Sequence, residues 1–453
     1  MTDFMERIVA LSKRRGFVYP SSEIYGGFQA TYDYGPLGAE LKRLIKDDWW
    51  RFMVTDRDDV VGLDAAILMS PRVWEASGHV EGFNDPMVDC KRCKGRFRAD
   101  RLDDVRCPEK PSKKPGECGG ELTEPRQFNM MFKTKAGPVD DSAATCYLRP
   151  ETAQGIFVNF KNVMETTRVK IPFGIAQTGK AFRNEIVTGN QLFRMREFEQ
   201  MEMEFFCEPG TELAWYEHWR QARLAWWKAL GVRPERLRLY EQTPEELAHY
   251  ANACSDVEYE YPWGFDEVEG VASRTDYDLK AHAAASGRPL AYHDQENKTW
   301  VVPYVVEPSC GVDRCFLTIL CDAYDEQTKP NGEQRTVLHL HPKLAPIQVG
   351  IFPLVKKDGL PEVAHALRAD LRKRFRTTYD EGGSIGKRYS RLDEIGTPWG
   401  ITVDGQTVED GTVTLRDRDA MTQERVHADH LLALLEERLA GYDRAKAAVV
   451  PEA

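Results

Sequence analysis

The residues best suited to chemistry in this sequence are charged side chains gathered in two neighbouring runs. Residues 180–186 read K-A-F-R-N-E-I, and residues 193–206 read F-R-M-R-E-F-E-Q-M-E-M-E-F-F. Neither run has an apolar stripe at helical spacing, so we expect two antiparallel strands whose alternate side chains share a face. The side chains expected to share faces are Arg183 and Glu185 on the first strand, and Arg196, Phe198, Gln200 and Glu202 on the second.

A sheet face lined with charge suits a charged ligand better than it suits packing. Unpaired charges that lose their water cost free energy, whereas a ligand of opposite charge would pair them. Guanidinium groups fit phosphates, and carboxylates fit amines. The alternative is an amphipathic hairpin with one solvated face, and the pattern alone does not decide between the two.

A second possible phosphate site overlaps the first strand. Residues 174–180 satisfy the G-x-x-x-x-G-K spacing of a phosphate-binding loop, but Ala181 stands where a Ser or Thr should bind the metal. The residues after Lys180 also read as strand, so no helix N-terminus would receive the phosphates. This alternative is therefore disfavoured.

The order Phe182-Arg183-Asn184-Glu185 resembles motif 2 of class II aminoacyl-tRNA synthetases, and the run F-R-M-R-E-F-E-Q-M-E is similar to that of the dimeric glycyl type. The resemblance implies that Arg183 holds the ATP α-phosphate and the amino-acid carboxylate. It implies that Glu185 meets the adenine amino group.

Three further segments carry the same resemblance. Residues 149–155 read R-P-E-T-A-Q-G, and residues 267–279 read E-V-E-G-V-A-S-R-T-D-Y-D-L, with Val268 in place of the family's Leu. Residues 301–314 resemble motif 3, whose Arg314 would contact the γ-phosphate and stack on adenine opposite an aromatic ring, expected to be Phe198. Residues 96–100 resemble a segment that reaches back to the amino-acid site through Arg98.

The resemblance therefore implies two sets of ligand-binding residues, with Arg183 and Arg314 as the catalytic residues. For ATP they are Arg183, Asn184, Glu185, Phe193, Arg194, Met195, Arg196, Glu197, Phe198, Glu267, Val268, Gly311, Val312, Asp313 and Arg314. For glycine they are Arg98, Glu151, Phe198, Glu199, Gln200, Met201, Glu202, Glu307, Pro308, Ser309, Cys310 and Gly311. Mg²⁺ is expected with the ATP, because it takes carboxylate oxygens and keeps substrate phosphates as ligands.

Four of the ten cysteines lie within residues 90–118. Cys90 and Cys93 have the spacing of half a zinc ribbon, but ten residues separate Cys107 from Cys118 where two would be usual. We expect structural zinc on these four cysteines, with free thiols or a degenerate ribbon as the alternative. The other six cysteines are scattered, which argues against a secreted disulfide scaffold and for a reducing compartment.

The elements that must position these residues follow from periodicity. Residues 39–53 are expected to form a long helix, followed by strands at 60–63 and 65–68 and by Pro71. This is the order of motif 1, which forms the dimer interface in the class; an ordinary surface helix is the alternative. The Trp-rich helix at 211–230 is expected to be core, without chemistry. From residue 345 a new βα pattern resembles an anticodon-binding domain, which implies tRNA(Gly) as partner.

The predicted fold class is thus an α+β class II catalytic domain on an antiparallel sheet with flanking helices, plus a mixed α/β domain and a Cys-rich insertion. The boundaries are 1–88 and 125–344 for the catalytic domain, 89–124 for the insertion and 345–453 for the anticodon-binding domain. A chain of 453 residues is long enough for all three.

Composition and charge limit the partners and the compartment that we expect for this protein. The formal charge of −11 argues against non-specific nucleic-acid coating but leaves a local RNA site possible. No signal peptide or run long enough to span a bilayer is found, so we expect a cytoplasmic protein without a membrane partner.

Two other functions compete with a glycyl enzyme. A class II synthetase for Thr, Ser or Pro would lack the R-P-E-T and E-P-S acids. A non-catalytic paralogue would be expected to have lost Arg183, Glu185 or Arg314, and all three are present.

Overall fold

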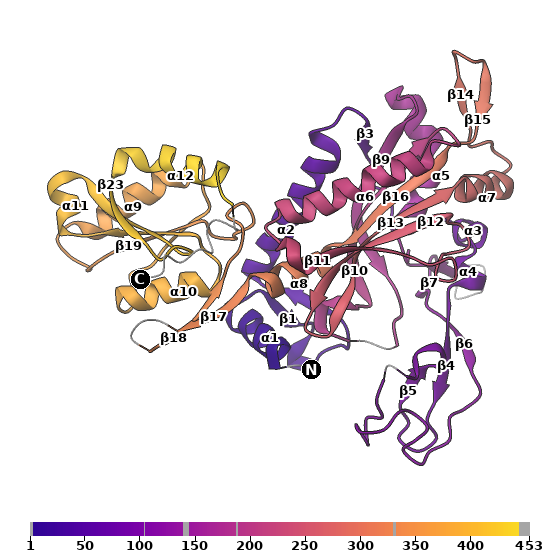
Figure 1. The fold of residues 1–453 in the computed structure, drawn as a ribbon, viewed down its shortest axis with the longest axis horizontal. Coiled ribbons are helices and arrows are strands. Elements are labelled where there is room, and N and C mark those ends of the chain that lie inside the picture. The colour runs from indigo at the N-terminus through magenta and orange to yellow at the C-terminus, as the bar shows by residue number, and fades with distance from the viewer. Residues whose placement is uncertain (1–2, 104, 139–144, 187–188, 329–331, 444–453) are drawn as a thin grey trace.

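A seven-stranded sheet forms the centre of the molecule in the computed structural model, which describes residues 3–103, 105–138, 145–186, 189–328 and 332–443 (Figure 1). Neighbouring strands are antiparallel, except for the parallel pair β3 and β9 at one edge. The predicted antiparallel sheet is therefore confirmed, with one parallel addition. Across the sheet the strands are β11 (Leu237–Glu241), β12 (Ala253–Tyr261), β13 (Gly264–Thr275), β16 (Tyr304–Gly311), β10 (Glu197–Cys207), β9 (Phe173–Phe182) and β3 (Val60–Gly62).

The hairpin expected from the two charged runs is the pair β9 and β10, but β9 ends at Phe182 and β10 begins at Glu197, so Arg183, Glu185 and Arg196 lie on the connection and not on the strands. The register aligns Phe182 with Glu197 at the end where residues 183–196 join the two strands. The segment with the phosphate-loop spacing lies inside β9, so that alternative is wrong: an extended strand cannot wrap a phosphate. On the other side of β10, Glu202 lies opposite Ser309 of β16, which in turn lies opposite Gly270 of β13.

Helices cover the two faces of the sheet unequally. Met201, Met203 and Phe205 of β10 point to one face and join the main core with α1 (Asp3–Arg15), α2 (Pro36–Trp50), α6 (Glu212–Ala229) and α8 (Val312–Ala323). Phe206 points to the other face and packs against α5 (Ala153–Thr167) and α7 (Tyr277–Ser286). The remaining length of that second face, near Phe198 and Gln200, is open to a cavity.

Short elements complete the body. The expected helix at 39–53 is α2, which continues into a π-helical turn, Arg51–Thr55. The expected strand at 65–68 is absent apart from one bridge at Leu68, because the backbone of Ala65 bonds to the side chains of Gln177 and Arg149 instead of a strand. The other short elements are α3 (Pro71–Ala76), α4 (His79–Gly82), β1 (Val18–Pro20), β2 (Tyr32–Tyr34), β7 (Lys133–Lys135), β8 (Thr145–Tyr147), β14 (Tyr292–Asp294), β15 (Thr299–Val301), β17 (Tyr324–Thr328) and β18 (Gln334–Leu338).

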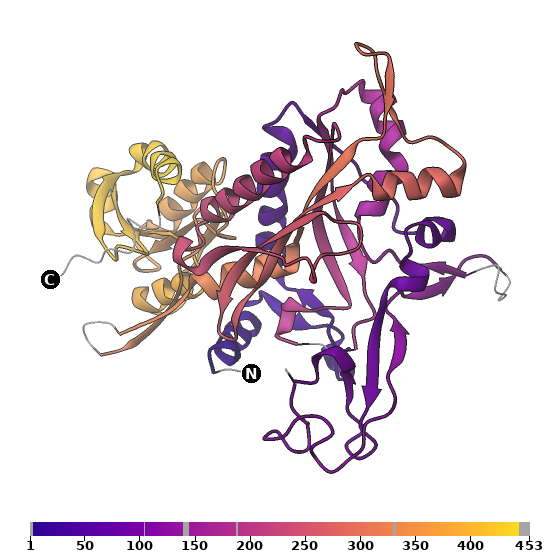
Figure 2. The same ribbon diagram turned by 45° about the vertical axis from the view of Figure 1, so that its right-hand side comes forward.

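A Cys-rich unit projects from the body, as both ribbon views show (Figures 1 and 2). It is a three-stranded sheet with β4 (Asn84–Asp89) between β5 (Arg96–Arg98) and β6 (Arg126–Asn129). Its small core contains Val88, Phe97 and three buried cysteines.

The C-terminal unit, in yellow and orange in Figure 1, has a separate sheet and a separate core. Its five strands follow the order β20 (Thr377–Tyr379), β19 (Val349–Pro353), β21 (Trp399–Val403), β22 (Thr412–Asp417) and β23 (Gln423–His427). Its helices are α9 (Leu360–Leu371), α10 (Ile385–Glu394), α11 (Gly405–Asp410) and α12 (Leu431–Ala440). A buried pair, Arg335 Nε to Asp393 Oδ2 at 2.8 Å, joins it to β18.

No helix among the described residues combines the length and apolar character needed to cross a membrane.

Candidate active site

A cavity of about 290 Å³ opens on the second face of the sheet, over β10, β13 and β16. Most of the charged residues singled out in the sequence line it. One end, here called the acid end, is formed by Glu151, Glu202, Glu307 and Ser309, and the other, the arginine end, by Arg183, Arg194 and Arg314 with Glu185 and Glu267. The other predicted residues on its wall are Phe193, Met195, Phe198, Gln200, Gly311 and Asp313.

Glu202 is the most enclosed acid of the acid end, at 2% exposure. It accepts hydrogen bonds from Ser309 Oγ at 2.7 Å, from Gln200 Nε2 at 3.2 Å and from the hydroxyl of Thr152. Burial, with the charge of Glu151 beside it, raises the pKa of Glu202. Three donors therefore fix the direction of this carboxyl group before any ligand arrives.

Glu151 is held by the imidazole ring of His79, a residue that the sequence did not single out. His79 Nε2 lies 3.3 Å from Glu151 Oε2, while Gln154 Nε2 donates to Glu151 Oε1 at 2.9 Å. Burial alone would raise the pKa of Glu151, but His79, Arg274 and Gln154 hold it well below its usual range. Glu151 is therefore an ionised acid in this pocket.

Arg274 is the second residue that sequence reasoning missed. It is 3% exposed and donates to Asp278 at 2.9 and 3.1 Å and, through Nη1, to Glu307. Burial raises the pKa of Glu307 to about 8 against the opposing charge of Arg274, and Glu202 and Glu151 add to the rise. In the sequence, the role of Arg274 was indicated only by its i, i+4 spacing from Asp278 within residues 267–279, the run that resembles the family.

The guanidinium groups at the arginine end are anchored by backbone carbonyls. Arg183 Nε donates to Pro150 O at 3.0 Å, and Arg314 donates to Phe193 O and Glu267 O, each at 3.1 Å. The remaining N–H groups can therefore receive a ligand's oxygens. Glu185, also at this end, has its pKa raised by burial, although Arg194 and Arg183 oppose the rise.

Aromatic rings lie beside both arginines. Phe198, expected across the adenine from Arg314, lines the same cavity, and its ring lies 5.3 Å from the Arg183 guanidinium, which also contacts Phe83 at 5.4 Å. The ring next to Arg314 is Phe193, at 4.4 Å. Both arginines thus have an aromatic face to support the guanidinium plane.

Five predicted ligand residues are placed in the interior instead. In a strand, neighbouring side chains point to opposite faces, so residues flanking Glu202, Glu267 and Ser309 point away from the cavity. Met201, Val268, Pro308 and Cys310 are buried for this reason, and Val312 is buried as the first residue of α8.

Five other predicted residues are engaged beside the cavity and do not line it. Glu199 pairs with Lys42 at 2.9 Å and Lys46 at 2.7 Å on α2, and Glu197 pairs with Lys180. Arg196 Nε donates to Glu185 O at 3.0 Å. Arg98 pairs with Asp85 at 3.0 Å, and the backbone of Asn184 bonds to Met130. Of these, Arg98 still lies close enough for its charge to lower the pKa of Glu185.

The wall near β12 was not foreseen at all. Asp256 lies there, with Gln242 Nε2 donating to its Oδ2 at 3.0 Å. Burial, with the nearby charge of Glu267, raises the pKa of Asp256 to about 7. No motif marks this strand, and the other unforeseen lining residues are Leu192, Tyr250, Cys254, Gly270 and Ala272.

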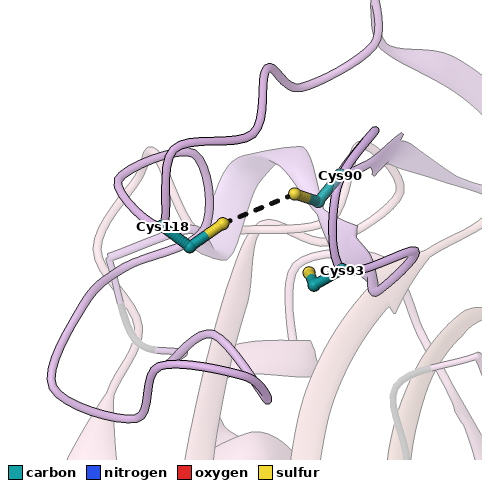
Figure 3. Close-up of side chains that lie close together, drawn as sticks. All are labelled: Cys90, Cys93 and Cys118. Atoms are coloured by element: carbon teal, nitrogen blue, oxygen red, sulfur yellow. Dashed lines mark hydrogen bonds between the residues drawn. The ribbon is translucent and has the colours of Figure 1, made fainter.

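The four clustered cysteines come together in the Cys-rich unit. Sulfur atoms of Cys90, Cys93 and Cys118 lie within 4.8 Å of one another, and Figure 3 shows them converging. Cys107 is also buried, and its sulfur is in hydrogen-bond contact with those of Cys118 and Cys93.

The backbone around two of these sulfurs, those of Cys90 and Cys107, favours thiolates. Backbone N–H groups of Cys93 and Arg92 lower the pKa of Cys90 to about 7. The N–H groups of Lys110 and Glu109, at the same spacing after Cys107, lower the pKa of that thiol despite its burial. A Cβ at Gly120 would lie 2.7 Å from the Cys90 sulfur, so a glycine is needed there. The turn after Cys107 therefore matches the turn after Cys90 without supplying a second cysteine, and Cys118 completes the set.

Known families match two parts of the chain. The description "tRNA synthetase class II core domain (G, H, P, S and T)" matches residues 132–324, and "Anticodon binding domain" matches residues 348–438. A prolyl-tRNA synthetase from Cryptosporidium parvum, solved with halofuginone and AMPPNP, has the same fold with a TM-score of 0.68 at 13% identity, covering 99% of this chain and 79% of that one. The predicted fold class is confirmed.

Curated relatives extend the match to nearly the full length. A glycine–tRNA ligase of Treponema denticola is 54% identical over 97% of this chain and 98% of its own length. A glycine–tRNA ligase of Geobacillus kaustophilus is 54% identical over 96% of this chain and 99% of its own length. The chain therefore belongs to the glycine–tRNA ligase family of class II aminoacyl-tRNA synthetases.

Proposed function

We propose that this chain activates glycine with ATP, forming glycyl-adenylate and pyrophosphate, and then transfers the glycyl group to the 3′-terminal adenosine of tRNA(Gly). The observation that carries the proposal is the pairing of an acid end and an arginine end within one cavity. Its acids suit an ammonium group and its guanidinium groups suit phosphates. The ten free cysteines fit a reducing compartment such as the cytoplasm.

Different residues bind the two substrates and stabilise charge in the first step. Glu151, Glu202 and Glu307 receive the glycine ammonium, which directs its carboxylate toward Arg183. That carboxylate attacks the α-phosphorus, and pyrophosphate leaves. Arg183 neutralises charge developing at the α-phosphate, while Arg194 and Arg314 hold the departing phosphates. Positioning and charge stabilisation account for the step without a general base.

Mg²⁺ fits the arginine end of the cavity. The carboxylates of Glu267 and Asp256 lie on its wall, and hard cations take carboxylate together with phosphate oxygens. These two residues would hold the ion, which supplies a positive charge to the phosphates.

An ATP–pyrophosphate exchange assay across amino acids tests the activity. Glycine should support exchange, and alanine, serine, threonine and proline should not. Equal exchange with proline would contradict the glycine assignment. It would favour proline, the amino acid of the prolyl enzyme with the similar fold.

The C-terminal unit is proposed to bind the anticodon arm of the tRNA. Arg372, Lys373 and Lys387 are exposed there, whereas Arg388 is buried and donates to three backbone carbonyls. Charge reversal of Arg372 and Lys373 to Glu should weaken tRNA charging, since each lost phosphate contact lowers affinity and its salt dependence. Glycine-dependent exchange serves as the internal control and should be unchanged.

Zinc is proposed as a structural ion on Cys90, Cys93, Cys107 and Cys118. Four thiolates close a tetrahedral site and leave no open position for catalysis. Metal analysis should find one zinc per chain, lost in Cys90→Ser and retained in Cys146→Ser, which removes a buried thiol elsewhere. Protein prepared without chelator that holds no zinc contradicts this site.

The chain is also proposed to form a homodimer through α2 and β3, whose helix-then-strand order resembles motif 1. Sedimentation analysis should give twice the chain mass. A monomer that retains full activity would rule out a dimer requirement.

A further inference from the structure

Glu204 is a buried acid that the proposed reaction does not use. It lies on β10 two residues beyond Glu202, so its side chain points to the same face of the sheet. It is 0% exposed, and neither carboxyl oxygen has a hydrogen-bond partner among the described residues. It is absent from the cavity wall and lies beneath the acid end. A buried acid left in this state requires an explanation.

The groups around Glu204 are mostly of its own charge. Single oxygens of Glu202, Glu204 and Glu307 lie within 4.8 Å of one another. Asp278 of α7 adds a further acid, and Ile175 is the apolar neighbour on β9. The one cation among them is Arg274, whose N–H groups are directed to Asp278 and Glu307.

Three carboxyl groups this close and this buried cannot all be ionised. Burial raises the pKa of Glu204 well above its usual range, and Glu307, Glu202 and Asp278 add to the rise that Arg274 opposes. A protonated Glu204 has an O–H that can donate, and the oxygens of Glu202 and Glu307 within 4.8 Å are available as acceptors.

We propose that Glu204 acts as a neutral carboxylic acid that donates a hydrogen bond to the Glu202–Glu307 pair and so positions the two carboxyl groups that receive the substrate ammonium. The inference rests on the proposed function, because it names a support for that ammonium site. Glu204 is a positioning residue: it lies beside the two acids and is absent from the cavity wall that would contact glycine.

A bound cation is the competing explanation for three clustered acids. Such a cation would need Glu204 ionised, whereas a hydrogen-bond donor needs it protonated. The geometry favours the donor, since Arg274 already supplies the positive charge in this cluster and Glu204 does not reach the cavity wall.

Two variants separate these roles. Glu204→Gln keeps the shape and a donor but removes the possibility of charge, whereas Glu204→Met keeps the size and removes the donor. Glu204→Gln should retain the wild-type KM for glycine to within about threefold, and Glu204→Met should raise it roughly tenfold or more, as expected when a hydrogen bond to a charged group is lost. The KM for ATP should change in neither. A merely structural role would instead lower thermal stability in both without this split.

Infrared difference spectra between wild type and Glu204→Gln give a readout independent of activity. The difference spectrum should contain, at neutral pH, the carbonyl stretch of one protonated carboxyl group that is present in the wild type and lost in the variant. Absence of that band overturns the proposal, as does Glu204→Gln being as impaired as Glu204→Met. A metal ion bound by the wild type and lost in Glu204→Gln also overturns it, in favour of the cation site. Wild-type protein without glycine-dependent exchange would count against the proposed function, while the infrared band would still decide the state of Glu204.

Discussion

At one end of the cavity carboxyl groups are held by other side chains, whereas at the other end guanidinium groups are held by backbone carbonyls. Glu202 accepts from Ser309, Gln200 and Thr152, all fixed by the sheet or by packing. The Arg183 guanidinium has one backbone anchor, and that of Arg314 has two besides an ion pair with Glu267, which leaves N–H groups of both for a ligand. A small cation such as an ammonium needs fixed acids around it, while a flexible triphosphate needs donors that can adjust. The difference therefore matches the two proposed ligands.

The arginine end should be the more sensitive to loss of one side chain. Arg183→Ala should lower glycine-dependent exchange by about 10²–10³-fold, because one donor to a developing charge is lost. Its fold should be intact, since the lost structural bond is a single one to Pro150 O. Steady-state exchange and circular dichroism measure the two effects.

Arg238→Ala is the matched control for that variant. Arg238 pairs with Glu258 on an outer pair of strands away from the cavity and should be dispensable. Equal losses in the two variants would mean that removal of positive charge, and not its place, lowers the rate.

At the acid end, Glu307→Gln should act mainly on glycine binding. Losing one charge-assisted bond to the ammonium should raise the KM for glycine by roughly tenfold or more, with a smaller change in the KM for ATP. An equal rise in the KM for ATP would show that the two ends do not bind different ligands. Glu241→Gln, which alters an acid of β11 that pairs with Arg220, is the control.

Ser309→Gly sharpens the description of the acid end. Ser309 lines the cavity, and its Oγ donates to Glu202 at 2.7 Å; we expect this side chain to occupy the space that a substrate's β-carbon would need. Removing it should favour alanine relative to glycine by about 1–3 kcal/mol in exchange specificity. An unchanged ratio of alanine to glycine in that assay would place the steric barrier on another residue.

The last expected effect is on the pH dependence of stability. The pKa of Glu307 is raised to about 8 from 4.5. A raised acid favours the folded state while it is protonated, so this stabilisation is complete below pH 4.5 and is lost as pH rises to about 8. Glu307→Gln should lose less stability over that window than the wild type, as measured by chemical unfolding at several pH values. Parallel slopes in the two proteins would show that Glu307 is ionised throughout.

Much of this site was predictable because it depends on local spacing. Alternation along one strand was enough to bring Phe198, Gln200 and Glu202 to one face. The same alternation should have excluded Glu199 and Met201, which a family resemblance alone had included. Site residues assigned by resemblance should therefore be checked against the alternation of side chains along the strand.

The residues that were missed depend on pairings between distant segments. His79 meets Glu151 and Arg274 meets Glu307 only once the strands and short helices have assembled. The predicted strand at 65–68 failed for a similar reason, since the side chain of Gln177, more than a hundred residues later, takes the hydrogen bond of Ala65. Such partners leave no trace in the spacing of either segment.

The carbonyl that anchors Arg183 belongs to Pro150, the residue immediately before Glu151. One peptide unit and one hydrogen bond thus link the first acid of one end to the arginine of the other, so the backbone at 150–151 positions both side chains. Because this link sets the span between the proposed ammonium and phosphate positions, we expect the site to select substrate length as well as bulk. Ser309→Gly should admit alanine in the exchange assay and still refuse β-alanine, whose backbone is one methylene longer, and acceptance of both would show that the site does not select length.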